Sequence, residues 1–256
     1  MKDTSWGGVA KWYYNLIERE PSNYQKDVIL PNILRLLDLK SGDNVLDLAC
    51  GQGFFSREFA KAGANVAGVD ISAELIAIAK KSIEGFLSKK LNIKFSVSPA
   101  DKIDFIKSSS IDKIAIILAI QNIGNMNGTF EECSRVLKES GKMCLVLNHP
   151  AFRVPKNSSW QFDEAGKTQY RRIDEYMSES KVPIQMHPGE KPSEMTVSFH
   201  RPLQVYFKAF KKAGFAITGL EEWISNKKSE VGPRAKAEDK ARKEIPLFLL
   251  LEAVKL

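Results

Sequence analysis

The stretch that most constrains the fold of this chain runs from Asn44 to Gly53 and reads NVLDLACGQG. A short apolar run here leads into a glycine turn, and an amphipathic segment begins at Phe54. A strand, a tight turn and a helix in this order are typical of the first unit of a doubly wound α/β domain, whose ligands bind at the carboxyl ends of the strands. We therefore expect a ligand site at this turn.

The residues of the turn also limit the kind of ligand. Gly51 and Gly53 are followed by Ser56 where a dinucleotide fingerprint needs a third Gly or Ala, and the turn has no G-x-x-x-x-G-K-[ST] phosphate loop. Asp47 precedes Gly51 in the strand, and its carboxylate would repel a diphosphate but attract an ammonium or sulfonium group. We expect a ligand that carries positive charge.

These residues resemble a known family. The run Val45–Gly53 is similar to the first motif of the class I S-adenosylmethionine-dependent methyltransferases, usually written V-L-D-L-G-x-G-x-G. Asp70 resembles the acid that ends their second strand, and Ser98–Asp101 resembles the third motif, which flanks the adenine. The ordered motifs span Val45–Leu147. Ala49 departs from the pattern by replacing the first glycine, which is free of strain only if its φ is negative.

The resemblance implies S-adenosylmethionine as the cofactor and a role for each motif. Gly51 and Gly53 would let the backbone approach the methionine part, Asp70 would accept both ribose hydroxyls, and Asp101 would bind the adenine amino group. The cofactor-binding residues that we expect are Trp12, Tyr13, Asp47, Ala49, Gly51, Gly53, Asp70, Ile71, Ala100, Asp101, Ala119 and Asn122.

Each of these residues also has a simpler interpretation. The glycines could serve only the turn, Asp70 could cap the helix that begins near Ser72, and Asp101 could be a loop acid. The order and spacing of the whole set favour the cofactor site.

The rest of the chain predicts a single α/β domain over residues 1–256. Strand and helix patterns alternate up to residue 148, which indicates parallel strands joined by crossovers. The resemblance implies a doubly wound, mostly parallel sheet of seven strands in the order 3-2-1-4-5-7-6, with the last strand antiparallel. We assign the last two strands to Phe215–Ile224 and Ile245–Val254.

Two further segments flank this pattern. Residues 1–40 read as helices with an aromatic start, Trp6–Tyr14, which we expect to act as a lid over the cofactor or, alternatively, to pack in the core. Residues 149–198 are too long for an ordinary connection, and we expect an inserted acceptor-binding segment; an extra surface layer is the alternative. The candidate acceptor residues are Gln121, Phe152, Trp160, Tyr170 and Arg201.

The histidines supply a candidate base. His149 follows the fifth strand and should face the cleft, with His200 as the second candidate; packing is the alternative for His149. Neither the three histidines nor the three cysteines have metal-ligand spacing, so we expect no metal site.

Composition limits the partners. The net charge of +7 makes nucleic acid possible, but the basic segment 227–243 is interrupted by acids and is explained more simply by a solvated helix. No apolar run is long enough for a membrane span, and we expect a cytoplasmic protein without a membrane partner. The sequence leaves the oligomeric state open.

The function that follows is methyl transfer from S-adenosylmethionine to an oxygen or carbon acceptor of small size. The sequence Ala119–Asn122 after the fourth strand lacks an N-P-P-Y tetrapeptide, which disfavours an amine of a nucleic acid base. A regulatory or partner subunit that binds the cofactor without turnover is the alternative. A dinucleotide oxidoreductase is disfavoured by Ser56.

Overall fold

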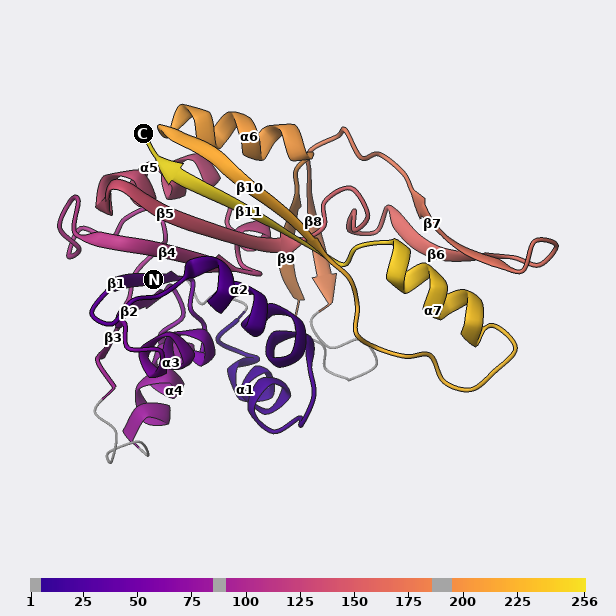
Figure 1. Cartoon of the computed structure of the whole chain (residues 1–256), viewed down its shortest axis with the longest axis horizontal. Coiled ribbons are helices and arrows are strands. Elements are labelled where there is room, and N and C mark those ends of the chain that lie inside the picture. The colour runs from indigo at the N-terminus through magenta and orange to yellow at the C-terminus, as the bar shows by residue number, and fades with distance from the viewer. Residues whose placement is uncertain (1–5, 85–90, 186–194) are drawn as a thin grey trace.

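The computed structural model describes residues 6–84, 91–185 and 195–256. Within these residues the chain forms a central sheet of seven strands in the order β3-β2-β1-β4-β5-β11-β10 (Figure 1). The strands are β1 (Asn44–Leu48), β2 (Asn65–Asp70), β3 (Ile93–Val97), β4 (Ile111–Ile117), β5 (Leu137–Asn148), β10 (Phe215–Trp223) and β11 (Phe248–Lys255). Strands β1 to β5 are parallel, and β11 is antiparallel to both of its neighbours, β5 and β10. The predicted strand order and the antiparallel last strand are confirmed.

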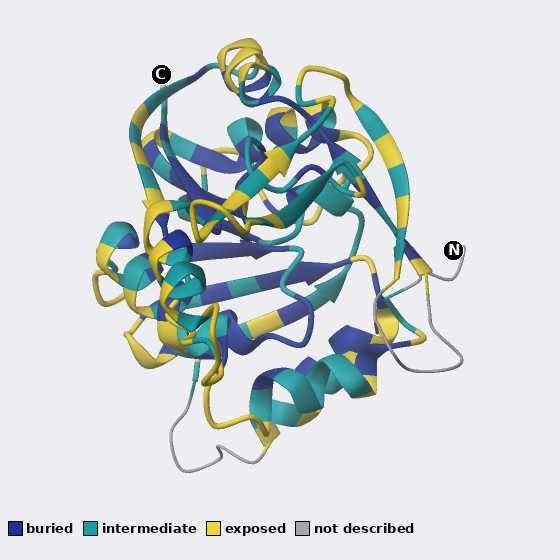
Figure 2. Cartoon of the chain, turned by 90° about the vertical axis from the view of Figure 1, so that its right-hand side faces the viewer, coloured by how far each residue is buried: buried dark blue, intermediate teal, exposed yellow. Residues whose placement is uncertain are grey.

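The central strands are buried on both faces. In β1, Leu46 and Leu48 belong to one core and Val45 to the other, and β4 and β5 alternate in the same way. Continuous apolar runs such as Ile114–Ile117 are what a parallel strand covered on both faces requires. Figure 2 shows the buried residues concentrated on these strands.

Helices cover the two faces of the sheet. On one face pack α1 (Ala10–Glu18), the π-helix η1 (Gln25–Ile29), α2 (Leu30–Leu37) and α3 (Phe54–Lys61). On the other face pack α5 (Met126–Val136) and α6 (Leu203–Lys212). Helix α4 (Ala73–Glu84) packs against β3, and the short 3-10 helix η2 (Ile120–Asn122) follows β4. The predicted helices before the first strand are therefore present.

The segment after β5 forms two β-hairpins. Strand β6 (Ser158–Asp163) pairs with β7 (Thr168–Ile173), and β8 (Ser180–Gln185) pairs with β9 (Met195–His200). The β6–β7 hairpin packs against α7 (Ala235–Glu244), beyond the carboxyl end of β5 (Figure 1). Parts of the predicted lid and of the predicted insertion, residues 1–5 and 186–194, lie outside the described residues.

Two classes of structure are missing from the described part of the chain. It contains no helix with the length and apolar character that a membrane span needs. It also contains no group of three or more side chains that could hold a metal ion.

Candidate functional site

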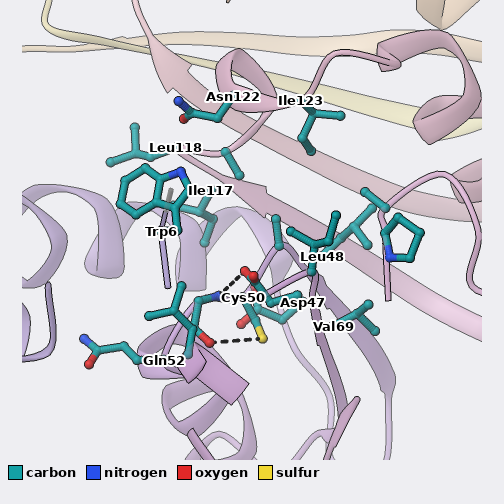
Figure 3. Close-up of a pocket in the computed structure, with 18 of the residues that line it drawn as sticks. Trp6, Asp47, Leu48, Cys50, Gln52, Val69, Ile117, Leu118, Asn122 and Ile123 are labelled. Atoms are coloured by element: carbon teal, nitrogen blue, oxygen red, sulfur yellow. Dashed lines mark hydrogen bonds between the residues drawn. The ribbon is translucent and has the colours of Figure 1, made fainter. Parts of the chain in front are cut away.

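A cavity of about 310 Å³ lies at the carboxyl ends of β1, β2 and β4 (Figure 3). It is where the crossover pattern of a doubly wound sheet places its ligands. The structure brings ten of the predicted cofactor residues into its wall, namely Tyr13, Asp47, Ala49, Gly51, Asp70, Ile71, Ala100, Asp101, Ala119 and Asn122. Two others, Trp12 and Gly53, are not part of the wall.

The two glycines of the turn have different structural roles. Gly51 lines the cavity with φ +56°, and a Cβ there would lie 3.5 Å from the ring of Tyr13. Gly53 has φ +76° and begins α3, and a Cβ there would lie only 2.5 Å from the ring of Phe95. Gly53 therefore permits the packing of α3 on β3, which corrects its expected place beside the ligand.

The backbone of the cavity wall is strained at two residues. Ala49 has φ +58° and Leu118 has φ +53°, and both line the cavity. A left-handed conformation costs a residue other than glycine roughly 1–2 kcal/mol. From the sequence, an unstrained backbone at Ala49 required a negative φ, but the observed φ is positive. Such strained residues cluster at ligand sites, which fits their position here.

Asp47 is buried under the turn, with only 2% of its surface exposed. Its Oδ2 accepts a hydrogen bond from the Ser56 hydroxyl at 2.5 Å. The pKa of Asp47 is raised to about 7: burial is the main cause, the hydrogen bond from Ser56 opposes it, and the negative charge of Asp70 acts in the same direction as burial. Asp47 is thus poised between its neutral and charged forms near neutral pH.

Asp70 holds the turn together. Its Oδ2 accepts from the Gly51 N–H at 2.8 Å and its Oδ1 accepts from the Ser72 N–H at 2.9 Å. The cap of α4 is instead Ser72, whose Oγ accepts from the Leu75 N–H at 3.2 Å. An ionised carboxylate has about four acceptor positions, so each oxygen of Asp70 keeps one for a ligand.

Asp101 also lines the cavity. Its Oδ2 accepts from the side-chain amide of Asn125 at 2.6 Å, and Asn125 also caps α5 by accepting from the Gly128 N–H at 3.1 Å. Sequence reasoning missed Asn125, although an Asn at the start of a helix is a recognisable cap signal.

The aromatic segment Trp6–Tyr14 contributes two rings to the cavity wall. Trp6 and Tyr13 both line the cavity, with their rings 5.5 Å apart in an edge-to-face arrangement. Burial raises the pKa of Tyr13 to about 12, and the charges of Asp70 and Asp47 act in the same direction. On α1, Glu18 forms an ion pair with the buried Arg57 of α3. This pair joins α1 to α3.

Comparison with known proteins identifies the family. A family model described as a methyltransferase domain matches residues 39–178, which contain the strands and acids of the cavity. The chain belongs to this methyltransferase domain family.

Other methyltransferases share parts of the sequence. A demethylmenaquinone methyltransferase of Tropheryma whipplei is 31% identical over 117 residues, which are 45% of this chain and 46% of that protein. A ubiquinone biosynthesis O-methyltransferase of Xanthomonas oryzae is 26% identical over 135 residues, 53% of this chain and 55% of that protein. The chain spans about half the length of the curated relatives it matches.

Solved methyltransferase structures share the whole fold. An S-adenosylmethionine-dependent methyltransferase of Mesorhizobium loti has a TM-score of 0.70 at 24% identity, covering 91% of this chain and 100% of that one. A second, described as a putative S-adenosylmethionine-dependent methyltransferase of Listeria monocytogenes, has a TM-score of 0.65 at 25% identity, with 87% and 97% covered. The similarity to the first of these covers a larger share of the chain than residues 39–178.

The expected orientation of His149 in this methyltransferase fold is wrong. Its side chain does not line the cavity and is 4% exposed. Its Nε2 lies 2.7 Å from Oε1 of Glu222 on β10, and its Nδ1 accepts from the Ala151 N–H at 3.2 Å. Burial lowers the pKa of His149, and the hydrogen bond to Glu222 opposes that change. The ring packs in the loop after β5, as the alternative interpretation held.

His200 and Arg201 border a second cavity of about 420 Å³ and not the first. His200 Nε2 lies 2.7 Å from the Tyr176 carbonyl oxygen. Arg201 donates to the carbonyls of η2 and the loop after it, at Ile120, Ile123 and Gly124. Arg201 therefore supports the wall of the first cavity without lining it, and its contact with an acceptor stays a prediction.

The remaining candidate acceptor residues also lie outside the cavity wall. Gln121 donates to the Leu118 carbonyl at 2.9 Å, and Trp160 stacks with the guanidinium of Arg171 at 5.3 Å. Phe152 and Tyr170 do not line the cavity either, and no described residue of 149–198 does. In its described part the insertion thus contributes no side chain to this wall. Its β6–β7 hairpin packs on α7, and its strand β9 packs on η2, where Asn122 of the wall donates to the Val197 carbonyl at 2.9 Å.

Gln52 is another wall residue that sequence reasoning missed. Gln52 lines the cavity between the two glycines of the turn, and its side chain is buried without a hydrogen-bond partner. The motif treats this position as variable, so the sequence carries no signal for it.

Proposed function

We propose that this protein transfers the methyl group of S-adenosylmethionine to a small-molecule acceptor. The observation that carries the proposal is the charge of the cavity wall. Asp47, Asp70 and Asp101 line it, and the described wall contains no lysine, arginine or histidine. A ligand with a sulfonium and an ammonium group fits such a wall, whereas the diphosphate of a dinucleotide would be repelled.

The cavity residues also fit the separate parts of the ligand. Asp70 keeps an acceptor position on each oxygen for two ribose hydroxyls, and Asp101 can accept from the adenine amino group. The positive φ of Gly51 lets the backbone pass close to the methionine part.

When bound, S-adenosylmethionine supplies an electrophilic methyl group to a nucleophile placed in line with it. The protein contributes the position of the two partners and the exclusion of water. Trp6 and Tyr13 close one side of the cavity, and Ile117, Leu118 and Ile123 supply apolar surface on another. No imidazole lines the described wall. We therefore expect either that water takes the proton of the acceptor or that the pKa of the acceptor is low enough for it to be ionised before it reacts.

For the acceptor, the relatives suggest where to begin. Their names refer to demethylmenaquinone and to ubiquinone biosynthesis, so quinone precursors with a ring hydroxyl or an acidic ring carbon are the first compounds to test. The apolar wall suits a flat ring. We also propose that the protein acts in the cytoplasm, which cell fractionation would test.

Calorimetric titration tests the cofactor part of the proposal. Adenosylhomocysteine should bind and NADH should not; the reverse result would contradict the proposal and favour the oxidoreductase. A screen of quinone precursors for release of adenosylhomocysteine then tests turnover. Binding without turnover of any compound in a broad metabolite screen would favour the non-catalytic subunit.

A further inference from the structure

Arg153 follows the carboxyl end of β5, and its charge has no partner. Its backbone N–H donates to the His149 carbonyl at 2.9 Å, in the turn that comes directly after the strand. The residue is partly buried, yet among the described residues its guanidinium takes part in no ion pair and no hydrogen bond. Arginine stays charged, and a cation that is partly withdrawn from water without a counter-charge is costly. An anion from outside the chain would supply the missing charge.

A second guanidinium lies beside Arg153. Arg171 of β7 donates from Nε at 2.8 Å to the Phe152 carbonyl, which belongs to the peptide that joins Phe152 to Arg153. Its Nη2 donates to the Ser158 hydroxyl at 2.8 Å, and this second bond fixes the guanidinium in place. Burial lowers the pKa of Arg153, and the charge of Arg171 lowers it further. An anion that binds both groups would replace their repulsion by attraction.

Aromatic rings and a third cation border this pair of arginines. The ring of Trp160 stacks with the guanidinium of Arg171 at 5.3 Å. Tyr24 acts on the pKa of Arg153 in the direction opposite to burial, and Lys227 Nζ lies 5.0 Å from the centre of the Tyr24 ring. Such surroundings suit an aromatic acid, because its ring can pack on aromatic side chains while its acid group meets the cations.

No acid neutralises this site. None of its three cations takes part in an ion pair with another described residue. Two acids of neighbouring elements are bound to other side chains: Glu222 of β10 lies 2.7 Å from His149, and Asp174 pairs with Arg172 at 2.9 Å. The positive charge of the site is therefore available to a ligand.

The two arginines lie on the same side of the sheet as the first cavity. Leu118 of the cavity wall donates from its backbone N–H to the Val146 carbonyl at 2.8 Å, so the end of β4 lies against the last residues of β5. Arg153 follows these residues, and the carboxyl ends of parallel strands share the ligand-binding edge of a sheet. The described cavity wall has acids and no basic side chain. An acid group on a ligand of this cavity would therefore bind outside that wall.

We infer that Arg153 and Arg171 bind the acid group of the methyl acceptor, a carboxylate or a phosphate, and that the acceptor is a small aromatic acid. The acceptor identity rests on the proposed function, whereas the oxyanion site rests on the arginines alone. Among the compounds with a ring hydroxyl, those that also carry an acid group are then the first to test.

Three compounds with one ring test the inference. Benzoate and phenyl phosphate carry the two acid groups, and benzamide is a neutral match for benzoate. Saturation-transfer NMR measures their dissociation constants with adenosylhomocysteine at saturation, so that the first cavity is occupied. The proteins are the parent, Arg153→Gln, Arg171→Gln and the control Arg172→Gln. Arg172 is the exposed neighbour of Arg171 on β7 and already pairs with Asp174.

At least one of the two acids should bind the parent, and the tighter one identifies the acid group. Benzamide should bind at least tenfold more weakly, because it cannot form charge-assisted hydrogen bonds. Arg153→Gln should lower the affinity for the tighter acid at least tenfold and, without ligand, should melt no lower than the parent, since a charge without a counter-charge is removed. Arg171→Gln should also lose the acid but melt lower, because its bonds to Phe152 and Ser158 are lost. Arg172→Gln should bind the acid like the parent.

Other results would overturn the inference. These are equal binding of the acid to the parent and to Arg153→Gln, binding of benzamide as tight as that of benzoate, and no binding of either acid. An acid that displaces adenosylhomocysteine lies in the first cavity and would overturn it too. A parent that fails to bind adenosylhomocysteine would instead overturn the proposed function, and the same comparison without that ligand would still decide whether the arginines form an oxyanion site.

Discussion

The charge state of Asp47 decides part of the stability of the fold. An unfolded aspartate loses its proton above about pH 4, whereas burial keeps Asp47 protonated up to its pKa of about 7. A pKa raised from 3.8 to about 7 corresponds to about 4 kcal/mol, and this loss accumulates as pH rises between these values. At pH 8 the stability of the ligand-free protein is therefore lowered by the cost of burying the ionised Asp47 carboxylate. At low pH Asp47 is neutral and this cost is absent.

Asp47→Asn removes this dependence, because an amide does not ionise. Between pH 5 and pH 8 the free energy of unfolding of the parent should fall by roughly 2–3 kcal/mol relative to the variant. Urea unfolding at the two pH values measures the difference, and subtraction cancels the titration of all other groups. Identical pH dependence in the two proteins would mean that Asp47 ionises normally.

Asp70 combines a structural and a predicted ligand role, so its replacement must be chosen with care. Removing the whole carboxyl, as in Asp70→Ala, would also leave the N–H groups of Gly51 and Ser72 without their acceptor. Asp70→Asn keeps one acceptor oxygen but loses the charge that strengthens hydrogen bonds to the ribose.

Asp70→Asn should weaken the binding of adenosylhomocysteine at least tenfold in a calorimetric titration, because charge-assisted hydrogen bonds contribute about 1.5–3 kcal/mol. Asp104→Asn is a matched control, since Asp104 is an exposed acid outside the cavity wall. An unchanged dissociation constant for Asp70→Asn would mean that Asp70 stabilises the turn and does not bind the ligand.

Helix α1 carries Tyr13 of the cavity wall, and we propose that it works as part of a lid. Its pair between Glu18 and Arg57 is mostly buried, and Arg57 has no other acidic partner among the described ion pairs. A buried guanidinium that loses its counter-charge costs several kcal/mol, so the contact between α1 and α3 should open more often in Glu18→Gln.

Limited proteolysis measures this opening. Glu18→Gln should be cut faster within residues 6–20 than the parent, and adenosylhomocysteine should slow the cutting of the parent. The exposed Glu20 supplies the control Glu20→Gln, which should behave like the parent. Equal cutting of the parent with and without ligand would argue against a lid.

On the scale of the whole molecule, the sheet is continuous from β3 to β10, and the cavity sits at its middle. A ligand that binds only the folded state stabilises a single cooperative unit by mass action. At one hundred times its dissociation constant, adenosylhomocysteine should add about 2.7 kcal/mol. The thermal midpoint should then rise by roughly 5–10 °C in one transition, whereas NADH should leave it unchanged. Two separate transitions would show that the hairpins and α7 unfold as a unit of their own.

Local patterns in the sequence predict the layers of the fold and the turn at which the cavity lies. An apolar run, a glycine turn and the acids Asp47 and Asp70 are contiguous or ordered patterns, and a parallel strand buried on both faces has to be apolar along its length. The order of the strands followed from the resemblance of these patterns to a family. The position of the cavity at this turn could therefore be predicted from the local sequence alone.

Only the tertiary structure decided which side chains face the cavity. His149 turns to Glu222 and Arg201 holds the carbonyls after β4, and these partners are distant in the sequence. The conformation of Ala49 and the missing partner of Gln52 are likewise invisible in the sequence. The physical reason is that a strand or helix pattern is local, whereas the direction of a side chain at the end of a strand depends on neighbours that other elements bring to it.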